Sequence, residues 1–193
     1  MDDKLILAVY TGLVALVSAL IGFLVNHYLT LLREVNVRRR AETAHYLERQ
    51  IGELYGPLLG MIEHSEMIYE ILRKKLAQQA APKIDFTKLN EQDGQVWRFF
   101  QERFFLPMNA EIRDLIRSKT HLLERGLMPE SFLQFFVHEA HYACLHPLWK
   151  EHGISSLEVR GVSWPESFRR DVGNTLAQLT QRHQHLIAVT HLG

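Results

Sequence analysis

The residues best suited to chemistry lie in one histidine-rich segment, residues 138–146. Imidazole and thiolate side chains are good zinc ligands. If the segment is helical, three-residue steps place His138, His141 and Cys144 near one face of the helix. These three residues are the candidates for a metal site. They support an alternative prediction, a metal-dependent enzyme that uses the helix from His138 to His146.

The spacing of these residues does not fit the established zinc motif on a helix. That motif, H-E-x-x-H, places its second histidine four residues after the first, and Tyr142 occupies this position here. Steps of three residues also drift by about 60° per step around a helix of 3.6 residues per turn. We therefore expect ordinary surface or partly buried histidines, with no bound metal and no cofactor.

Other sequence signatures of catalysis are missing. The chain has no G-x-S-x-G elbow, no phosphate-binding P-loop and no G-x-G-x-x-G turn. A single cysteine, Cys144, excludes an intrachain disulfide. The 22 basic residues balance the 22 acidic ones, so the chain lacks the positive field of a general nucleic-acid binder. We expect no catalytic residue and no nucleic-acid partner, which favours a protein that is not an enzyme.

An uncharged apolar run, Leu5–Val25, stands near the N-terminus. At ~1.5 Å per helical residue, it covers roughly the 30 Å hydrocarbon thickness of a bilayer. A cleaved signal peptide is the main alternative, with Val17–Ala19 as the cleavage site. However, the residues before the run are not positively charged, and the run continues well past that site. Residues 1–32 are therefore predicted to be a transmembrane anchor.

The charges that flank the run predict its orientation. One lysine stands against two aspartates before the run, whereas four arginines and one glutamate follow it. Positive charge stays on the cytoplasmic side, so we predict a single pass through the cell (inner) membrane. The N-terminus is then outside and the C-terminal domain is cytoplasmic. Arg38, Arg39 and Arg40 could also contact anionic headgroups, although we favour the interpretation that they only fix the orientation.

Small residues form a stripe along the predicted anchor, at spacings that alternate between four and three. Membrane helices associate through close backbone approach and polar contacts, and small side chains permit that approach. We expect this face to contact another membrane helix, from a second copy of the chain or from a membrane protein partner. The stripe consists of Ala8, Gly12, Ala15, Ala19, Gly22 and Asn26.

Residues 33–193 are predicted to form an all-α domain, a four- to five-helix bundle with kinked helices. A first helix continues from the membrane with an apolar stripe at helical spacing, which a short coiled coil would also show. Gly56-Pro57 predicts a sharp kink or a short break, since proline removes a helical N–H. The stripe consists of Ala44, Leu47, Ile51, Leu54, Leu58, Met61, Ile68 and Leu72, with Ser65 in one slot.

A connection is predicted near residues 77–93, which lack a clear period. The next helix should begin near Gly94, with Trp97, Phe100 and Phe104 on one face; Phe99 and Phe105 widen this aromatic set. Pro107 should kink or end this helix. We expect Asn109 to cap a continuation to about Arg125, where Gly126 suits a helix C-terminus.

Two further helices complete the prediction. The first begins near Pro129, bends at Pro147 and ends at Gly153. The second runs from about Trp164 to Ala188, after a capping box formed by Ser163 and Glu166. The predicted buried residues are Phe132, Phe135, Phe136, Ala140 and Ala143 in the first helix, and Phe168, Val172, Leu176, Leu179 and Ile187 in the second.

Taken together, these patterns favour a membrane-tethered helical interaction or scaffold module. It should either associate with itself or join a membrane complex. Besides the metal-dependent enzyme, a membrane-perturbing toxin or defence effector remains an alternative, because an oligomerising anchor could also serve that role.

Overall fold

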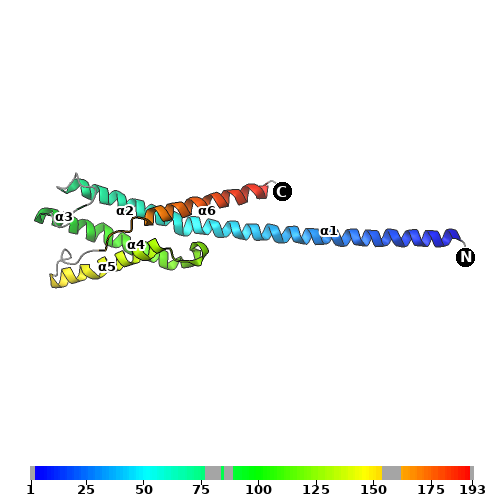
Figure 1. Cartoon of the computed structure of the whole chain (residues 1–193), viewed down its shortest axis with the longest axis horizontal. Helices are drawn as coiled ribbons and strands as arrows, with labels where there is room; N and C mark the ends of the chain where they lie inside the picture. The colour runs from blue at the N-terminus through cyan, green and yellow to red at the C-terminus, as the bar shows by residue number, and fades with distance from the viewer. Residues whose placement is uncertain (1–2, 77–83, 85–88, 154–161, 192–193) are drawn as a thin grey trace. The chain divides into compact units, whose positions relative to one another are not determined.

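The computed structural model describes residues 3–76, 84, 89–153 and 162–191; side chains are described for 10–76, 84, 89–148, 150–153 and 162–188. Helices dominate these residues, and none of them forms a strand (Figure 1). The predicted all-α class is therefore confirmed. The chain divides into two compact units, Met1–Tyr46 with His185–Gly193, and Leu47–Gln184.

The N-terminal unit is dominated by one long helix, α1 (Asp3–Arg49) (Figure 1). Its large apolar side chains from Tyr10 to Val37 are exposed, as Phe23 and Leu16 illustrate with exposed fractions of 67% and 69%. An 18-residue window at its apolar end has a mean hydropathy of 1.8, and none of that window is buried. In the described chain, this is the one helix long and apolar enough to cross a membrane.

The second unit is a bundle of shorter helices. It contains α2 (Gly56–Lys75), α3 (Glu91–Phe100), α4 (Leu106–Ser118), α5 (Glu130–His152) and the first part of α6 (Phe168–His191). Helix α4 packs against both α2 and α5 (Figure 1). The predicted helical bundle is therefore confirmed. Residues 77–83 and 85–88, which make up most of the predicted connection, lie outside the described residues.

The two predicted proline distortions take the same form. A π-helical segment, η1 (Gln50–Tyr55), ends directly before Gly56-Pro57, and a second one, η3 (Gln101–Phe105), ends directly before Leu106-Pro107. In each case, the N–H of the residue before the proline donates to the carbonyl five residues earlier. A sharp kink or a short break was predicted at Gly56-Pro57, and the break is absent because Tyr55 and Gly56 keep right-handed helical angles; Pro57 lies in the first turn of α2, as predicted. The helix widens there by one residue instead.

The buried side chains of α1, η1 and α2 follow the predicted stripe at most positions. Around η1, Gln50 and Ile62 are buried where the regular stripe had predicted Ile51 and Met61, which are only half-buried. Leu47, Leu54, Leu58, Ser65, Ile68 and Leu72 are buried as predicted.

Two neighbouring phenylalanines of the second π turn differ in their surroundings. Phe105 packs against the cluster formed by Leu72, Leu76 and Ile84, whereas Phe104 remains 38% exposed. Phe100 and Phe104 do share a face, as predicted, since their ring centroids are 5.5 Å apart, but Phe105 is the residue that reaches the buried cluster.

Two predicted helix boundaries are also corrected. Helix α3 begins at Glu91, and Asn90 caps it by accepting a hydrogen bond from the Asp93 N–H at 2.8 Å. Asn109 lies buried inside α4 and does not act as a cap. Helix α4 stops at Ser118, since the 3-10 turns η4 (Thr120–Leu122) and η5 (Glu124–Gly126) follow it.

Gly126 has the positive φ of +66° that suits a helix end, but it ends η5 rather than a long α-helix. Helix α5 begins directly after Pro129 and stops before Gly153, as predicted. Helix α6 begins at Phe168, four residues later than predicted. Ser163 lies five residues before the first residue of α6, so it is not the N-cap of this helix, and the Phe168 N–H donates to the Pro165 carbonyl at 3.1 Å.

Polar contacts join η1 to the turns after α4. The buried Gln50 amide donates to the Leu122 carbonyl at 2.9 Å, and the Tyr55 hydroxyl accepts from the Glu124 N–H at 3.1 Å. Both side chains belong to the widened turn. They satisfy backbone groups of η4 and η5 that a regular helix would not reach.

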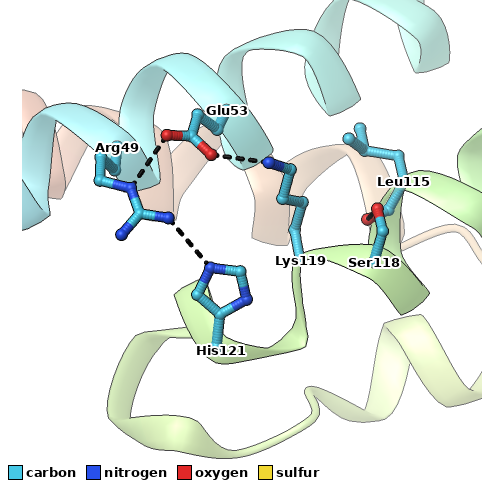
Figure 2. A network of polar contacts seen from close by, with 6 residues as sticks. All are labelled: Arg49, Glu53, Leu115, Ser118, Lys119 and His121. Atoms are coloured by element: carbon cyan, nitrogen blue, oxygen red, sulfur yellow. Dashed lines mark hydrogen bonds and ion pairs between the residues drawn. The ribbon is translucent and has the colours of Figure 1, made fainter.

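An ion-pair network lies beside these contacts (Figure 2). Glu53 accepts from Lys119 at 2.7 Å and from Arg49 at 2.9 Å, and Arg49 Nη2 lies 3.2 Å from His121 Nε2. The hydrogen bonds from Lys119 and Arg49 lower the pKa of Glu53 to about 2. Because the side chains of Arg49, Glu53 and Lys119 are each about a third exposed, solvent weakens these ion pairs, and we expect them to contribute little to the stability of the fold.

The close approach at Gly56 yields a stability prediction. A Cβ atom at Gly56 would lie 2.7 Å from the Ile51 carbonyl oxygen, whereas a Cβ at Gly60 of the same helix would meet nothing within 4 Å. We expect Gly56→Ala to lower the free energy of unfolding by about 1–3 kcal/mol. Gly60→Ala should instead raise it by about 0.5–1 kcal/mol, through helix propensity.

Chemical unfolding of the two variants in detergent, followed by circular dichroism, measures both effects. Equal stabilities for Gly56→Ala and Gly60→Ala would contradict the π-turn geometry at Gly56.

Candidate functional site

A cavity of about 390 Å³ lies in the second unit. Its walls come from α2, from the stretch α3–η3–α4, from α5 and from the segment that precedes α6. The second π turn contributes Gln101 and Phe105, and the next residues along the chain contribute Leu106 and Asn109. The proline-linked distortion at Pro107 therefore shapes one wall of the cavity.

Aromatic side chains form much of the lining: Tyr69, Trp97, Phe105, Tyr142 and Trp164. The rings of Trp97 and Phe105 are 5.8 Å apart between centroids. On the other side, the His138 ring lies 4.8 Å from Tyr142 and 5.4 Å from Trp164. These packed rings give the cavity walls that are rigid and largely apolar.

His138 lines the cavity and is buried. Its Nδ1 lies 2.7 Å from the Val162 carbonyl oxygen. A carbonyl can only accept a hydrogen bond, so Nδ1 carries the hydrogen and Nε2 of the neutral ring is an acceptor. Burial lowers the pKa of His138, which keeps the ring neutral at physiological pH.

Asn109 is the polar group that the fold leaves unsatisfied in the cavity wall. Its side chain is 95% buried, since its exposed fraction is 5%. Its Oδ1 has no hydrogen-bond partner. Leaving a buried amide without a partner costs about 1–3 kcal/mol, so this position is unfavourable unless something else satisfies it.

The charged residues of the lining are acidic. Glu66 and Glu166 are exposed and lie at the rim, and no lysine or arginine is among the described lining residues. Partial burial raises the pKa of Glu66, even though Arg169 Nε lies 3.1 Å from its carboxylate. The cavity therefore favours neutral or cationic molecules over anions.

The metal candidates do not form a ligand set. His138 is held by Val162, His141 is half-buried and Cys144 is exposed. Within the described ranges, no group of three His, Cys, Asp or Glu side chains could hold a metal ion.

The buried face of α5 differs from the prediction. Phe132 and Phe135 are buried as expected, but Ala140 and Ala143 are exposed, and His138 and Glu139 are buried in their place. The helical steps from Phe132 and Phe135 lead to Glu139 and His138. The apolar pattern misled the prediction because two polar residues occupy core positions.

Glu139 is buried through an ion pair. Its Oε1 accepts from Arg113 Nη1 of α4 at 2.6 Å, and Arg113 also contacts Asp114. This pair joins α4 to α5. The buried carboxylate of Glu139 therefore helps to hold these two helices together.

The predicted membrane-contact residues lie along α1. Gly12, Ala15, Ala19, Gly22 and Asn26 are exposed, and a Cβ atom on Gly12 or Gly22 would meet nothing within 4 Å. The side chain of Ala8 lies outside the described residues. The predicted headgroup contacts, Arg38, Arg39 and Arg40, are also exposed on α1.

Sequence reasoning did not find the cavity, because its lining is drawn from distant parts of the chain. The one available signal was the aromatic set near Trp97, which is wider than a single core stripe needs. Phe105, the residue of this set that packs against the cluster of Leu72, Leu76 and Ile84, lies in the π turn η3.

The Arg113–Glu139 pair gives a second prediction. Arg113→Leu leaves a buried carboxylate without its cation, and we expect a loss of about 2–4 kcal/mol in unfolding free energy. The double variant Arg113→Leu/Glu139→Leu should be less destabilised, since no charge is then left buried. Arg117→Leu, an exposed arginine on the same helix, should change stability by less than about 0.5 kcal/mol.

Thermal or urea unfolding of the three variants provides the comparison. A double variant less stable than Arg113→Leu alone would show that Glu139 does more than pair with Arg113.

No family model, no curated protein and no solved structure matches this chain.

Proposed function

We propose that this chain is a membrane-tethered helical interaction module. Residues 1–32 anchor it in the cell (inner) membrane, and residues 33–193 form a cytoplasmic domain that holds partners at the membrane surface. The observation that carries the proposal is the fully exposed apolar stretch of α1. So many exposed large apolar side chains are unfavourable in water, and burial of the helix in a lipid bilayer would remove them from it.

The free energy of inserting this helix into a membrane supports the proposal. The run Leu5–Val25 contains thirteen Leu, Ile, Val and Phe residues and no charged residue. At about −0.3 to −0.6 kcal/mol for each such residue, the run favours the membrane by roughly 4–8 kcal/mol. The arginines after the run favour an orientation with the larger domain inside.

The stripe from Ala8 to Asn26 supports association within the membrane. Nothing in the described chain covers Gly12 or Gly22. A partner helix could therefore approach the backbone closely at these positions. We propose a second copy of the chain, or a membrane protein, as that partner.

A membrane-insertion experiment tests the anchor. Full-length protein should stay in the membrane fraction after carbonate extraction, and only its N-terminus should be accessible from outside the cell. Leu16→Arg/Leu20→Arg should release it, because each arginine costs about 2.5–3.5 kcal/mol at the centre of a membrane helix. The control Leu127→Arg/Leu133→Arg changes two exposed leucines outside the run and should stay in the membrane.

Two results would overturn the anchor: full-length protein in the supernatant after high-speed centrifugation, or a mature chain whose first residues have been removed.

Association is tested separately, by crosslinking in native membranes. Gly12→Leu/Gly22→Leu should reduce the crosslinked dimer about tenfold, since bulky side chains keep helix backbones apart. Leu13→Ile/Leu24→Ile, which changes shape away from the stripe, should leave the dimer unchanged. An undiminished dimer in the glycine variant would refute the stripe as a contact face, while leaving the anchor itself intact.

A further inference from the structure

We propose that the cavity of the second unit binds a small organic amine in its protonated form. The apolar body of the amine would lie among the aromatic side chains, and its ammonium group would lie between the acidic rim and the Asn109 amide oxygen. This binding site is independent of the membrane anchor. The argument rests on the rings, the charges and the unsatisfied amide that meet in this one cavity.

The aromatic lining suits both parts of such a molecule. Trp97, Phe105 and Trp164 offer apolar contact to a hydrocarbon or aromatic body. The faces of aromatic rings, tryptophan above all, also attract ammonium groups through their quadrupole. Tyr69 and Tyr142 add two further rings, and burial raises the pKa of Tyr142, so its hydroxyl stays uncharged.

The charged residues that line the cavity favour a cationic ligand. Glu66 and Glu166 lie at the rim, His138 is neutral, and the described lining includes no lysine or arginine. An anion would therefore meet two carboxylates with no compensating base in the wall. Arg169 does contact Glu66, but it also binds Glu63 at 3.0 Å, on the exposed surface.

Asn109 provides a buried hydrogen-bonding group in the cavity wall. Its amide oxygen is buried and has no partner. The terminal torsion of an asparagine lies in a broad well, so the amide can turn to accept from an ammonium N–H. A ligand with such a donor would satisfy the one polar group that folding leaves unpaired there.

The size of the cavity limits the ligand. A volume of about 390 Å³ falls at the lower end of the range for small-molecule sites. A single aromatic ring with a short amine chain fits this volume, whereas a peptide does not. The proposed class is therefore a monoamine with one ring or a comparable aliphatic body.

Three probes with the same ring test the preference for charge: 2-phenylethylamine is a cation, 2-phenylethanol is neutral and 3-phenylpropanoate is an anion. Each is titrated by calorimetry into the full-length chain in phosphatidylcholine nanodiscs, and the signal of empty nanodiscs is subtracted. We expect the amine to bind with millimolar affinity or better, the alcohol about fivefold more weakly, and the carboxylate more weakly still.

Paired variants locate the site. Glu66→Gln/Glu166→Gln should weaken binding of the amine about tenfold and leave binding of the alcohol within about twofold. Glu70→Gln/Glu130→Gln removes the same charge from exposed positions outside the lining and should leave both unchanged. Asn109→Leu should also weaken binding of the amine. Circular dichroism should show that each variant remains folded.

The proposal is overturned if the alcohol or the carboxylate binds as tightly as the amine, or if none of the three binds. It is also overturned if the rim variant and its control bind the amine equally.

Discussion

The bundle depends on two π-helical turns, in each of which a backbone N–H donates to the carbonyl five residues earlier instead of four. Proline cannot donate a backbone hydrogen bond, and its ring crowds the preceding turn. At Pro57 and Pro107 the chain accommodates proline by widening that turn, so that the Gly56 and Leu106 N–H groups reach the Ile51 and Gln101 carbonyls. The helix continues, but the side chains of the widened turn are rotated relative to those of a regular helix.

This rotation has a different consequence at each site. At η1 it places Gln50 and Tyr55 where they can bond the backbone at Leu122 and Glu124, so the turns after α4 gain partners. At η3 it brings Phe105 inward and leaves Phe104 outside. The first π turn therefore serves cohesion of the bundle, while the second shapes a cavity.

Local signals in the sequence were enough for the helical class and for most of the helix-forming segments. Periodicity identified Leu54, Leu58 and Leu72 as core, and Pro129 and Gly153 marked the two ends of α5. The prediction erred at Ile51, where the neighbouring Gln50 is buried instead, because a polar side chain in a core position leaves no apolar signal. It also erred at Asn109 and Ser163, where a suitable capping residue was present but the helix began elsewhere.

The cavity could not be predicted, for a different physical reason. Its lining combines Tyr69, Gln101, His138 and Trp164, which are brought together by packing and share no spacing along the chain. A histidine-rich helix suggests metal chemistry when it is considered alone. In the bundle, however, Val162 holds His138 and Arg113 holds Glu139. Asn109 is different, because its buried oxygen has no partner. Among the described residues, Ser131 Oγ and His141 Nε2 are also buried without a partner, but of these three residues only Asn109 lines the cavity.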